Sequence, residues 1–93
     1  MGRPAVRILV EGRVQGVGFR WWVVAQASGL NLCGWVRNLT DGSVEALAIG
    51  DTQSIERLTE SCGRGPPGAE VLSVRTEAAQ DDGSTGFEQR ATI

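Results

Sequence analysis

The chain has 93 residues, of which 41% are hydrophobic and 22% charged, and its formal net charge is −2. These values predict one soluble globular domain over residues 1–93 with a single modest core. The acidic balance argues against a general nucleic-acid-binding protein. No apolar run approaches the roughly 20 residues that cross a bilayer, and the N-terminus lacks the apolar region of a secretory signal. We therefore expect a cytoplasmic monomer with no membrane or nucleic-acid partner.

Missing residue types restrict the chemistry further. The chain has no histidine, and all nine of its basic residues are arginine. A zinc site built on cysteine and histidine and any histidine-dependent nucleophilic triad are therefore excluded. The two cysteines, Cys33 and Cys62, are far apart in sequence, and we favour two free thiols buried as small hydrophobic side chains. We predict no cofactor and no metal.

The first third of the chain predicts a strand, a glycine loop and a helix. Residues 5–11 alternate in polarity, with Val6, Ile8 and Val10 on one face of a strand, and residues 12–18 form the loop. From Phe19 the apolar spacing becomes helical. The side chains on that helix face are Phe19, Val23, Ala27 and Leu30. The helix should end near residues 29–31, where Asn31 suits a left-handed C-terminal cap.

Further along, residues 32–38 and 43–49 predict a hairpin whose turn contains Asp41-Gly42. Asp51 is placed to cap a second helix over residues 52–62, and Gly63 to end it. The apolar face of that helix consists of Ile55, Leu58 and Cys62.

After this helix, residues 63–68 form a proline-rich connector, residues 69–77 a strand, 78–86 a polar loop, and 87–92 a short last strand. The order strand-helix-strand-strand-helix-strand, with one more strand, predicts an α+β ferredoxin-like (split βαβ) sandwich. In that fold an antiparallel sheet carries two helices packed on one face.

The glycine loop is the first candidate for a functional site. No glycine is followed by lysine, so a P-loop is excluded, and Gly16-Val17-Gly18 is only the first half of a dinucleotide fingerprint. An anion site of converging amides at a helix N-terminus does fit. Arg20 would lie in the first helical turn, where an anion offsets its charge and a phosphate matches its guanidinium. A solvated arginine after a tight turn is an equal alternative on spacing alone.

Two longer motifs make the pattern more specific. The stretches GRVQGVGFR (12–20) and GWVRNLTDGSVEALAIG (34–50) resemble the two signatures of the acylphosphatase family, and the resemblance extends over the whole chain in the same order. It implies the ferredoxin-like fold and hydrolysis of acyl phosphates to carboxylate and inorganic phosphate. It also implies Arg20 and Asn38 as catalytic residues. The phosphate-binding positions that it implies are Gln15, Gly16, Val17, Gly18, Phe19 and Arg20.

The chemistry is compatible with this implied activity. The leaving carboxylate has a pKa of roughly 4, so it needs little help from a general acid. Phosphoryl transfer depends mainly on positioning and charge stabilisation, which amides and arginine supply. Arg20 and the loop would hold the phosphoryl oxygens, and Asn38 would orient the attacking water. The chain departs from the family at Val23, often a threonine, and at Gln89, usually apolar.

Other interpretations remain open at this stage. The same pocket could serve a non-catalytic domain that senses phosphate or another anion. An RNA-binding domain of this fold needs aromatic residues on its central strands, and residues 5–11 and 43–49 contain none. Trp35 is expected in the core. For Trp21 and Trp22 we favour packing or a place at the pocket rim over stacking on a substrate.

Overall fold

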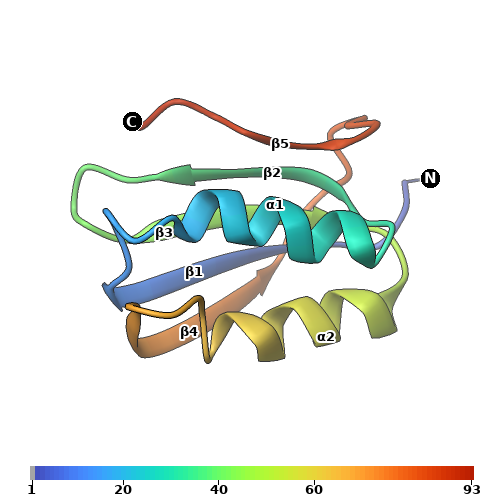
Figure 1. Ribbon diagram of the computed structural model, residues 1–93. Coiled ribbons are helices and arrows are strands. Elements are labelled where there is room, and N and C mark those ends of the chain that lie inside the picture. The colour runs from blue at the N-terminus through green and yellow to red at the C-terminus, as the bar shows by residue number, and fades with distance from the viewer. Residues whose placement is uncertain (1) are drawn as a thin grey trace.

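The computed structural model describes residues 2–93 and contains one five-stranded sheet with two helices on one face (Figure 1). The elements in chain order are β1 (Ala5–Arg13), α1 (Phe19–Gly29), β2 (Cys33–Asn38), β3 (Val44–Ile49), α2 (Thr52–Cys62), β4 (Glu70–Ala78) and β5 (Phe87–Gln89). The order of the strands in the sheet is β4-β1-β3-β2-β5. This is the ferredoxin-like α+β sandwich that the sequence predicts.

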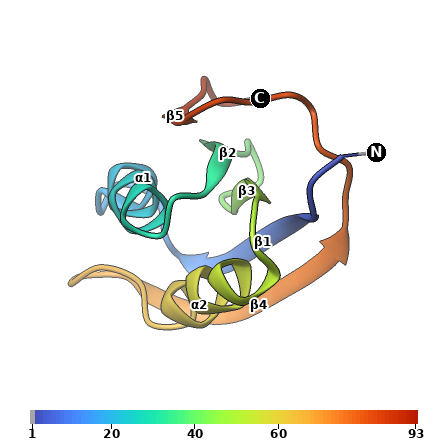
Figure 2. The same ribbon diagram turned by 90° about the vertical axis from the view of Figure 1, so that its right-hand side faces the viewer.

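One feature of the sheet differs from the prediction. Four strands pair antiparallel, but β5 runs parallel to β2. The link between β4 and β5 crosses from one edge of the sheet to the other, on the side away from α1 (Figure 2). After this crossing β5 enters the sheet from the same end as β2, and an entirely antiparallel sheet is therefore wrong.

The core lies between the helices and the inner face of the sheet. The predicted helix faces are confirmed for three residues of each helix, because Phe19, Val23 and Ala27 of α1 are buried, as are Ile55, Leu58 and Cys62 of α2. Leu30, the fourth predicted residue of the first face, follows the end of α1 and is only partly buried against the core. The inner strand positions with almost no exposure are Ile8, Val10, Val36, Val44 and Ala48. Each fully buried Val, Leu, Ile or Phe stabilises the fold by about 1.5–3 kcal/mol, so this layer holds both helices in place. No helix in residues 2–93 is long and apolar enough to cross a membrane.

The helix ends follow the local signals with one difference. Asp51 caps α2, because its Oδ2 accepts a hydrogen bond from the Ser54 N–H at 3.2 Å. Asn31 is left-handed at φ 58°, as expected after α1. Gly63 ends α2 but is right-handed at φ −65°, and the left-handed residue is Gly65 at φ 67°. A Cβ on Gly65 would lie 2.8 Å from Cε2 of Phe19, so a side chain at this reversal would clash with the core.

The first strand is longer than predicted. β1 continues to Arg13, so the loop before α1 covers residues 14–18 instead of 12–18. The register against β4 shifts between Glu11 and Gly12, which marks a bulge. Gly12 has φ 132°, and a Cβ there would come within 2.2 Å of the Glu70 carbonyl oxygen. Because β4 approaches so closely, only glycine fits at this position of β1.

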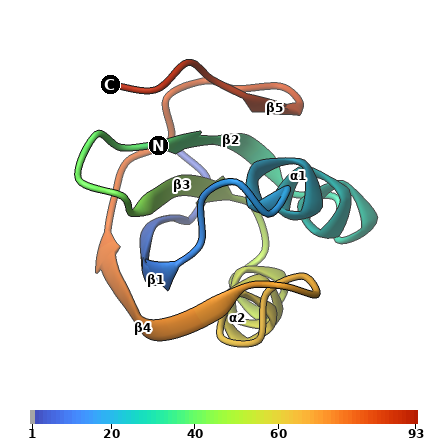
Figure 3. The ribbon, with the colours of Figure 1, turned by 60° about the vertical axis from the view of Figure 1, so that its left-hand side comes forward.

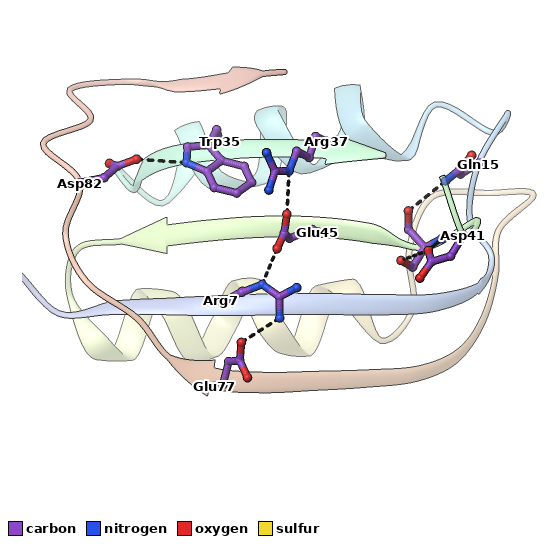
Figure 4. Close-up of polar contacts among 9 residues, drawn as sticks. Arg7, Gln15, Trp35, Arg37, Asp41, Glu45, Glu77 and Asp82 are labelled. Carbon is purple, nitrogen blue, oxygen red and sulfur yellow. Dashed lines mark hydrogen bonds and ion pairs between the residues drawn. The ribbon is translucent and has the colours of Figure 1, made fainter. Parts of the chain in front are cut away.

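Trp35 is not in the core, contrary to the prediction. Strand alternation turns Val36 toward the helices and Trp35 toward the opposite face, where Trp35 is half-buried. Its indole N–H donates to Asp82 Oδ2 at 3.1 Å. The guanidinium groups of Arg37 and Arg90 lie 4.5 and 5.0 Å from its ring centroid. Polar partners therefore surround the ring on the outer face (Figure 4).

A charged cluster crosses the same outer face. Glu45 is only 5% exposed and accepts hydrogen bonds from Arg37 Nε at 2.6 Å and from Arg7 Nε (Figure 4). Arg7 also donates to Glu77 on β4 at 2.8 Å. Burial alone would raise the pKa of Glu45, but the two arginines outweigh burial and hold that pKa below its usual value. The cluster joins β4, β1, β3 and β2 across the face that has no helix.

We expect Glu45→Gln to lower the free energy of unfolding at pH 7 by about 1.5–3 kcal/mol, the range for hydrogen bonds to a charged group. Because the folded pKa of Glu45 is lowered, its contribution is complete above its unfolded pKa, about 4.3, and is lost as pH falls through the folded pKa. In urea unfolding between pH 7 and pH 3, the difference in free energy of unfolding between wild type and Glu45→Gln should therefore become smaller at low pH. Glu56→Gln, at an exposed position of α2, is the control. A difference between wild type and Glu45→Gln that does not change with pH would contradict the role of the Glu45 charge.

Candidate functional site

The loop between β1 and α1 is anchored at both ends and open in the middle. Val14 and Phe19 are buried at 0% and 2% exposure. Between them Gly16 and Gly18 have φ of 75° and 78°. A Cβ at either glycine would meet nothing within 4 Å, so the backbone conformation, and not lack of space, is what requires glycine here. The loop therefore has the left-handed turns that sequence reasoning requires for converging amides.

The N-terminus of α1 has no side-chain cap. Gly18 is the N-cap residue, no side chain accepts a hydrogen bond there, and the first turn contains no acidic residue. The first amides of a helix lack partners within the helix and carry the positive end of its dipole. Arg20 adds a full positive charge in that turn, and no carboxylate of residues 2–93 lies within 4.0 Å of its guanidinium nitrogens. An anion would offset this concentration of positive charge.

Asn38, the last residue of β2, supplies a hydrogen-bond acceptor. Its Oδ1 is buried and has no hydrogen-bond partner among residues 2–93. An unsatisfied buried acceptor costs about 1–3 kcal/mol, so this atom is set to receive an O–H or N–H donor. The asparagine lies at the point where β2 ends beside the loop that precedes α1 (Figure 1).

These groups share one pocket of about 120 Å³. The lining residues are Val14, Gln15, Gly16, Gly18, Phe19, Arg20, Trp21, Asn38 and Gln89. Arg20 and Asn38, 18 residues apart in sequence (38 − 20), are thus brought together, as are all but one of the predicted loop positions. The exception is Val17, which is partly buried and packs against the core. Hydrogen-bond donors, a cation and one free acceptor therefore face the same small volume.

The side chain of Gln15 ties the loop to the β2–β3 turn. Its Nε2 donates to the carbonyl oxygens of Leu39 and Ser43 at 2.8 and 2.9 Å. Figure 4 shows Gln15 pointing toward the turn that contains Asp41. The turn is braced by Asp41, whose Oδ1 accepts from the Ser43 N–H and Oγ, and these bonds lower the pKa of Asp41. Because Leu39 follows Asn38 directly, the clamp fixes the loop relative to Asn38. Sequence reasoning missed this contact, since it considered only the main chain of Gln15.

The C-terminal segment completes the pocket wall. Gln89 of β5 lines the pocket, and the chain beyond it continues beside β2. The Arg90 N–H donates to the Val36 carbonyl at 2.8 Å, and the Ile93 N–H donates to the Asn38 carbonyl at 3.3 Å. Sequence reasoning treated Gln89 only as a departure from an apolar pattern. The pairing of β5 with β2 is what brings Gln89 to the pocket.

The cysteines lie outside this pocket, and no candidate metal centre occurs elsewhere in the described part of the chain. Cys33 and Cys62 are free thiols, as favoured above, but only Cys62 is fully buried. Burial raises the pKa of the Cys62 thiol to about 12, so it is unreactive at neutral pH. Residues 2–93 contain no group of three His, Cys, Asp or Glu side chains that could hold a metal ion.

Comparisons with known proteins agree with this architecture. The family model described as acylphosphatase matches residues 6–89. An acylphosphatase of Acidiphilium cryptum is 48% identical over 88 residues, which are 95% of this chain and 97% of that one. An acylphosphatase structure from Coxiella burnetii superimposes with a TM-score of 0.91 at 40% identity and covers 96% of this chain and 94% of its own. An acylphosphatase structure from Bacillus subtilis superimposes with a TM-score of 0.90 at 36% identity and covers 94% of this chain and 98% of its own.

We expect Gln15→Met, which keeps the side-chain length but removes both donors, to destabilise the protein by about 1–2 kcal/mol. Both carbonyls keep a main-chain partner, because the Gly42 N–H donates to Leu39 and the Leu39 N–H donates to Ser43. Amide hydrogen exchange in residues 39–43 should accelerate more than exchange in the helices. Gln53→Met, at an exposed position of α2, is the matched control, and unchanged exchange in the turn would contradict the clamp.

Proposed function

The chain belongs to the acylphosphatase family and is an enzyme, and from this premise we propose that it hydrolyses the carboxyl–phosphate bond of small acyl phosphates to carboxylate and inorganic phosphate. The observation that carries the proposal is the meeting of two unpartnered groups in one pocket. Within the described part of the chain, the Arg20 guanidinium has no carboxylate beside it and the buried Asn38 Oδ1 has no donor. A phosphoryl group and a water molecule are the ligands that satisfy both.

The phosphoryl group binds to the positive side of the pocket. The amides of Gln15, Gly16, Val17, Gly18 and Phe19 are its proposed main-chain donors, as the family pattern implies. Arg20 contributes a planar guanidinium that can bond two phosphoryl oxygens at once. Donors fixed before the substrate arrives stabilise charge on those oxygens in the transition state without reorganising. The buried ends of the loop supply this rigidity.

The attacking water is placed by Asn38. Its free Oδ1 accepts a hydrogen bond from one O–H of the water, which directs an oxygen lone pair toward phosphorus, on the side opposite the leaving carboxylate. An amide is not a base at neutral pH, so one of the water's protons passes to a phosphoryl oxygen while the other stays on the attacking oxygen. The P–O bond to the carboxylate breaks while the bond from water to phosphorus forms. The products are the carboxylate and inorganic phosphate.

The reaction so described needs neither a general acid nor a covalent intermediate. A carboxylate leaves without protonation because its conjugate acid has a pKa of roughly 4. We therefore propose a metal-independent reaction in which positioning and charge provide the acceleration. The alternative is a sensor domain that binds phosphate or a related anion in the same pocket without turnover.

We expect Arg20→Ala to lower kcat/KM for benzoyl phosphate by about 10³-fold or more, with effects on both binding and rate, since it removes a charge that contacts the phosphoryl group throughout the reaction. Asn38→Ala should lower kcat by about 10²–10³-fold and change KM by less than about threefold, because it acts on the water. Arg57→Ala, at an exposed position of α2 outside the pocket lining, serves as the arginine control. Initial rates at several substrate concentrations separate kcat from KM.

The same experiment distinguishes the two functions. A wild-type protein that binds inorganic phosphate but releases no carboxylate from benzoyl phosphate would be a sensor. Loss of activity on treatment with a chelator, restored by a divalent metal, would disprove the metal-independent reaction. Equal losses in Arg57→Ala and Arg20→Ala would show that the charge of Arg20 acts only at long range.

A further inference from the structure

We propose that Trp21 determines which acyl group the enzyme accepts, by packing its indole ring against a flat, uncharged, apolar acyl group such as an aromatic one. This inference rests on the proposed function, because it assigns the end of the substrate that the phosphoryl-binding groups do not touch. It names a substrate class for the pocket that Arg20 and Asn38 share.

The lining of the pocket leaves few groups free to contact the acyl portion. Val14 and Phe19 are buried in the core, and Gly16 and Gly18 have no side chains. The side-chain amide of Gln15 is already bonded to two carbonyl oxygens. Arg20 and Asn38 are assigned to the phosphoryl group and the water. The remaining lining residues are Trp21 and Gln89, which are also the only exposed lining residues that have side chains.

The two consecutive tryptophans of α1 have different environments. Trp22 is partly buried and meets Phe19 edge to face, with ring centroids 5.4 Å apart. Trp21 is 68% exposed and makes no aromatic or cation–π contact with residues 2–93. Successive side chains of a helix point about 100° apart, so Trp22 faces the core while Trp21 lies at the pocket edge. Packing within the protein therefore explains Trp22 and leaves Trp21 unexplained.

The position of Trp21 next to Arg20 matches the shape of an acyl phosphate. A volume of about 120 Å³ admits a phosphoryl group and a water, so a bulky acyl group must extend through the mouth of the pocket. Because Trp21 lines the same pocket as Arg20 and is exposed, we infer that its ring borders the route out of the phosphoryl site. Gln89 reaches the same mouth from β5, which lies next to α1 (Figures 1 and 3).

The chemistry of this mouth favours uncharged acyl groups. Trp21 and Gln89 are both neutral, so a charged acyl substituent would lose hydration without gaining an opposite charge. An indole offers a large apolar face, and aromatic pairs gain about 0.5–1.5 kcal/mol beyond the area that they bury. Acetyl phosphate is too small to cover that face and should gain little from it.

The test compares kcat/KM for benzoyl phosphate and acetyl phosphate in wild type, Trp21→Ala and Trp21→Phe. We expect Trp21→Ala to lower kcat/KM for benzoyl phosphate about fivefold to tenfold and to leave acetyl phosphate within twofold. Trp21→Phe should retain most of the preference, because phenylalanine also offers an aromatic face. Leu72→Ala, at an apolar residue 82% exposed outside the pocket, is the control and should change neither substrate.

Binding measurements keep this test separate from catalysis. Phenacylphosphonate and acetonylphosphonate replace the bridging oxygen by a methylene and cannot be hydrolysed in the same way. Trp21→Ala should weaken phenacylphosphonate about fivefold to tenfold in calorimetric titration and leave acetonylphosphonate nearly unchanged. Equal effects on both ligands, or no effect on either, would overturn the role of Trp21. Selective binding by a wild-type protein that turns over neither substrate would instead refute the hydrolase and retain the acyl recognition.

Discussion

The burial of Phe19 is the constraint on which the site depends. This residue begins α1, is 2% exposed, and contacts both Trp22 and the reversal at Gly65. Because its ring is enclosed, the first turn of α1 cannot shift relative to the sheet without opening the core. The loop amides, Arg20 and the end of β2 therefore keep one arrangement. The glycine loop is held rigidly at the end where it enters α1.

The site contains two polar groups, the Arg20 guanidinium and Asn38 Oδ1, that have no stabilising partner among residues 2–93. An arginine in the first turn of a helix is electrostatically unfavourable, and a buried carbonyl oxygen without a donor has lost its hydration. Both costs fall on the lining of one pocket, whereas Arg7 and Arg37 on the outer face of the sheet are paired with Glu45. Because a bound phosphoryl group and water would relieve both costs, these costs favour the binding of such ligands.

Sequence reasoning succeeded where the cause of a structure is local. The apolar spacing from Phe19, the cap at Asp51 and the left-handed Asn31 each depend on neighbours within a few residues, and all were predicted. It failed where distant segments approach one another. Gly12 belongs to β1 because β4 lies against it, and the Gln15 side chain bonds to carbonyls 24 and 28 residues away.

The sequence by itself determined the fold class, the family, and the residues that carry charge and hydrogen-bonding groups, because periodicity and motif spacing are written along the chain. Only the tertiary structure decided what each residue faces. It placed Trp35 on the outer face among arginines, ran β5 parallel to β2 so that Gln89 reaches the pocket, and left Trp21 exposed beside Arg20. The physical reason is that these positions depend on strand order and on which face of an element meets its neighbour.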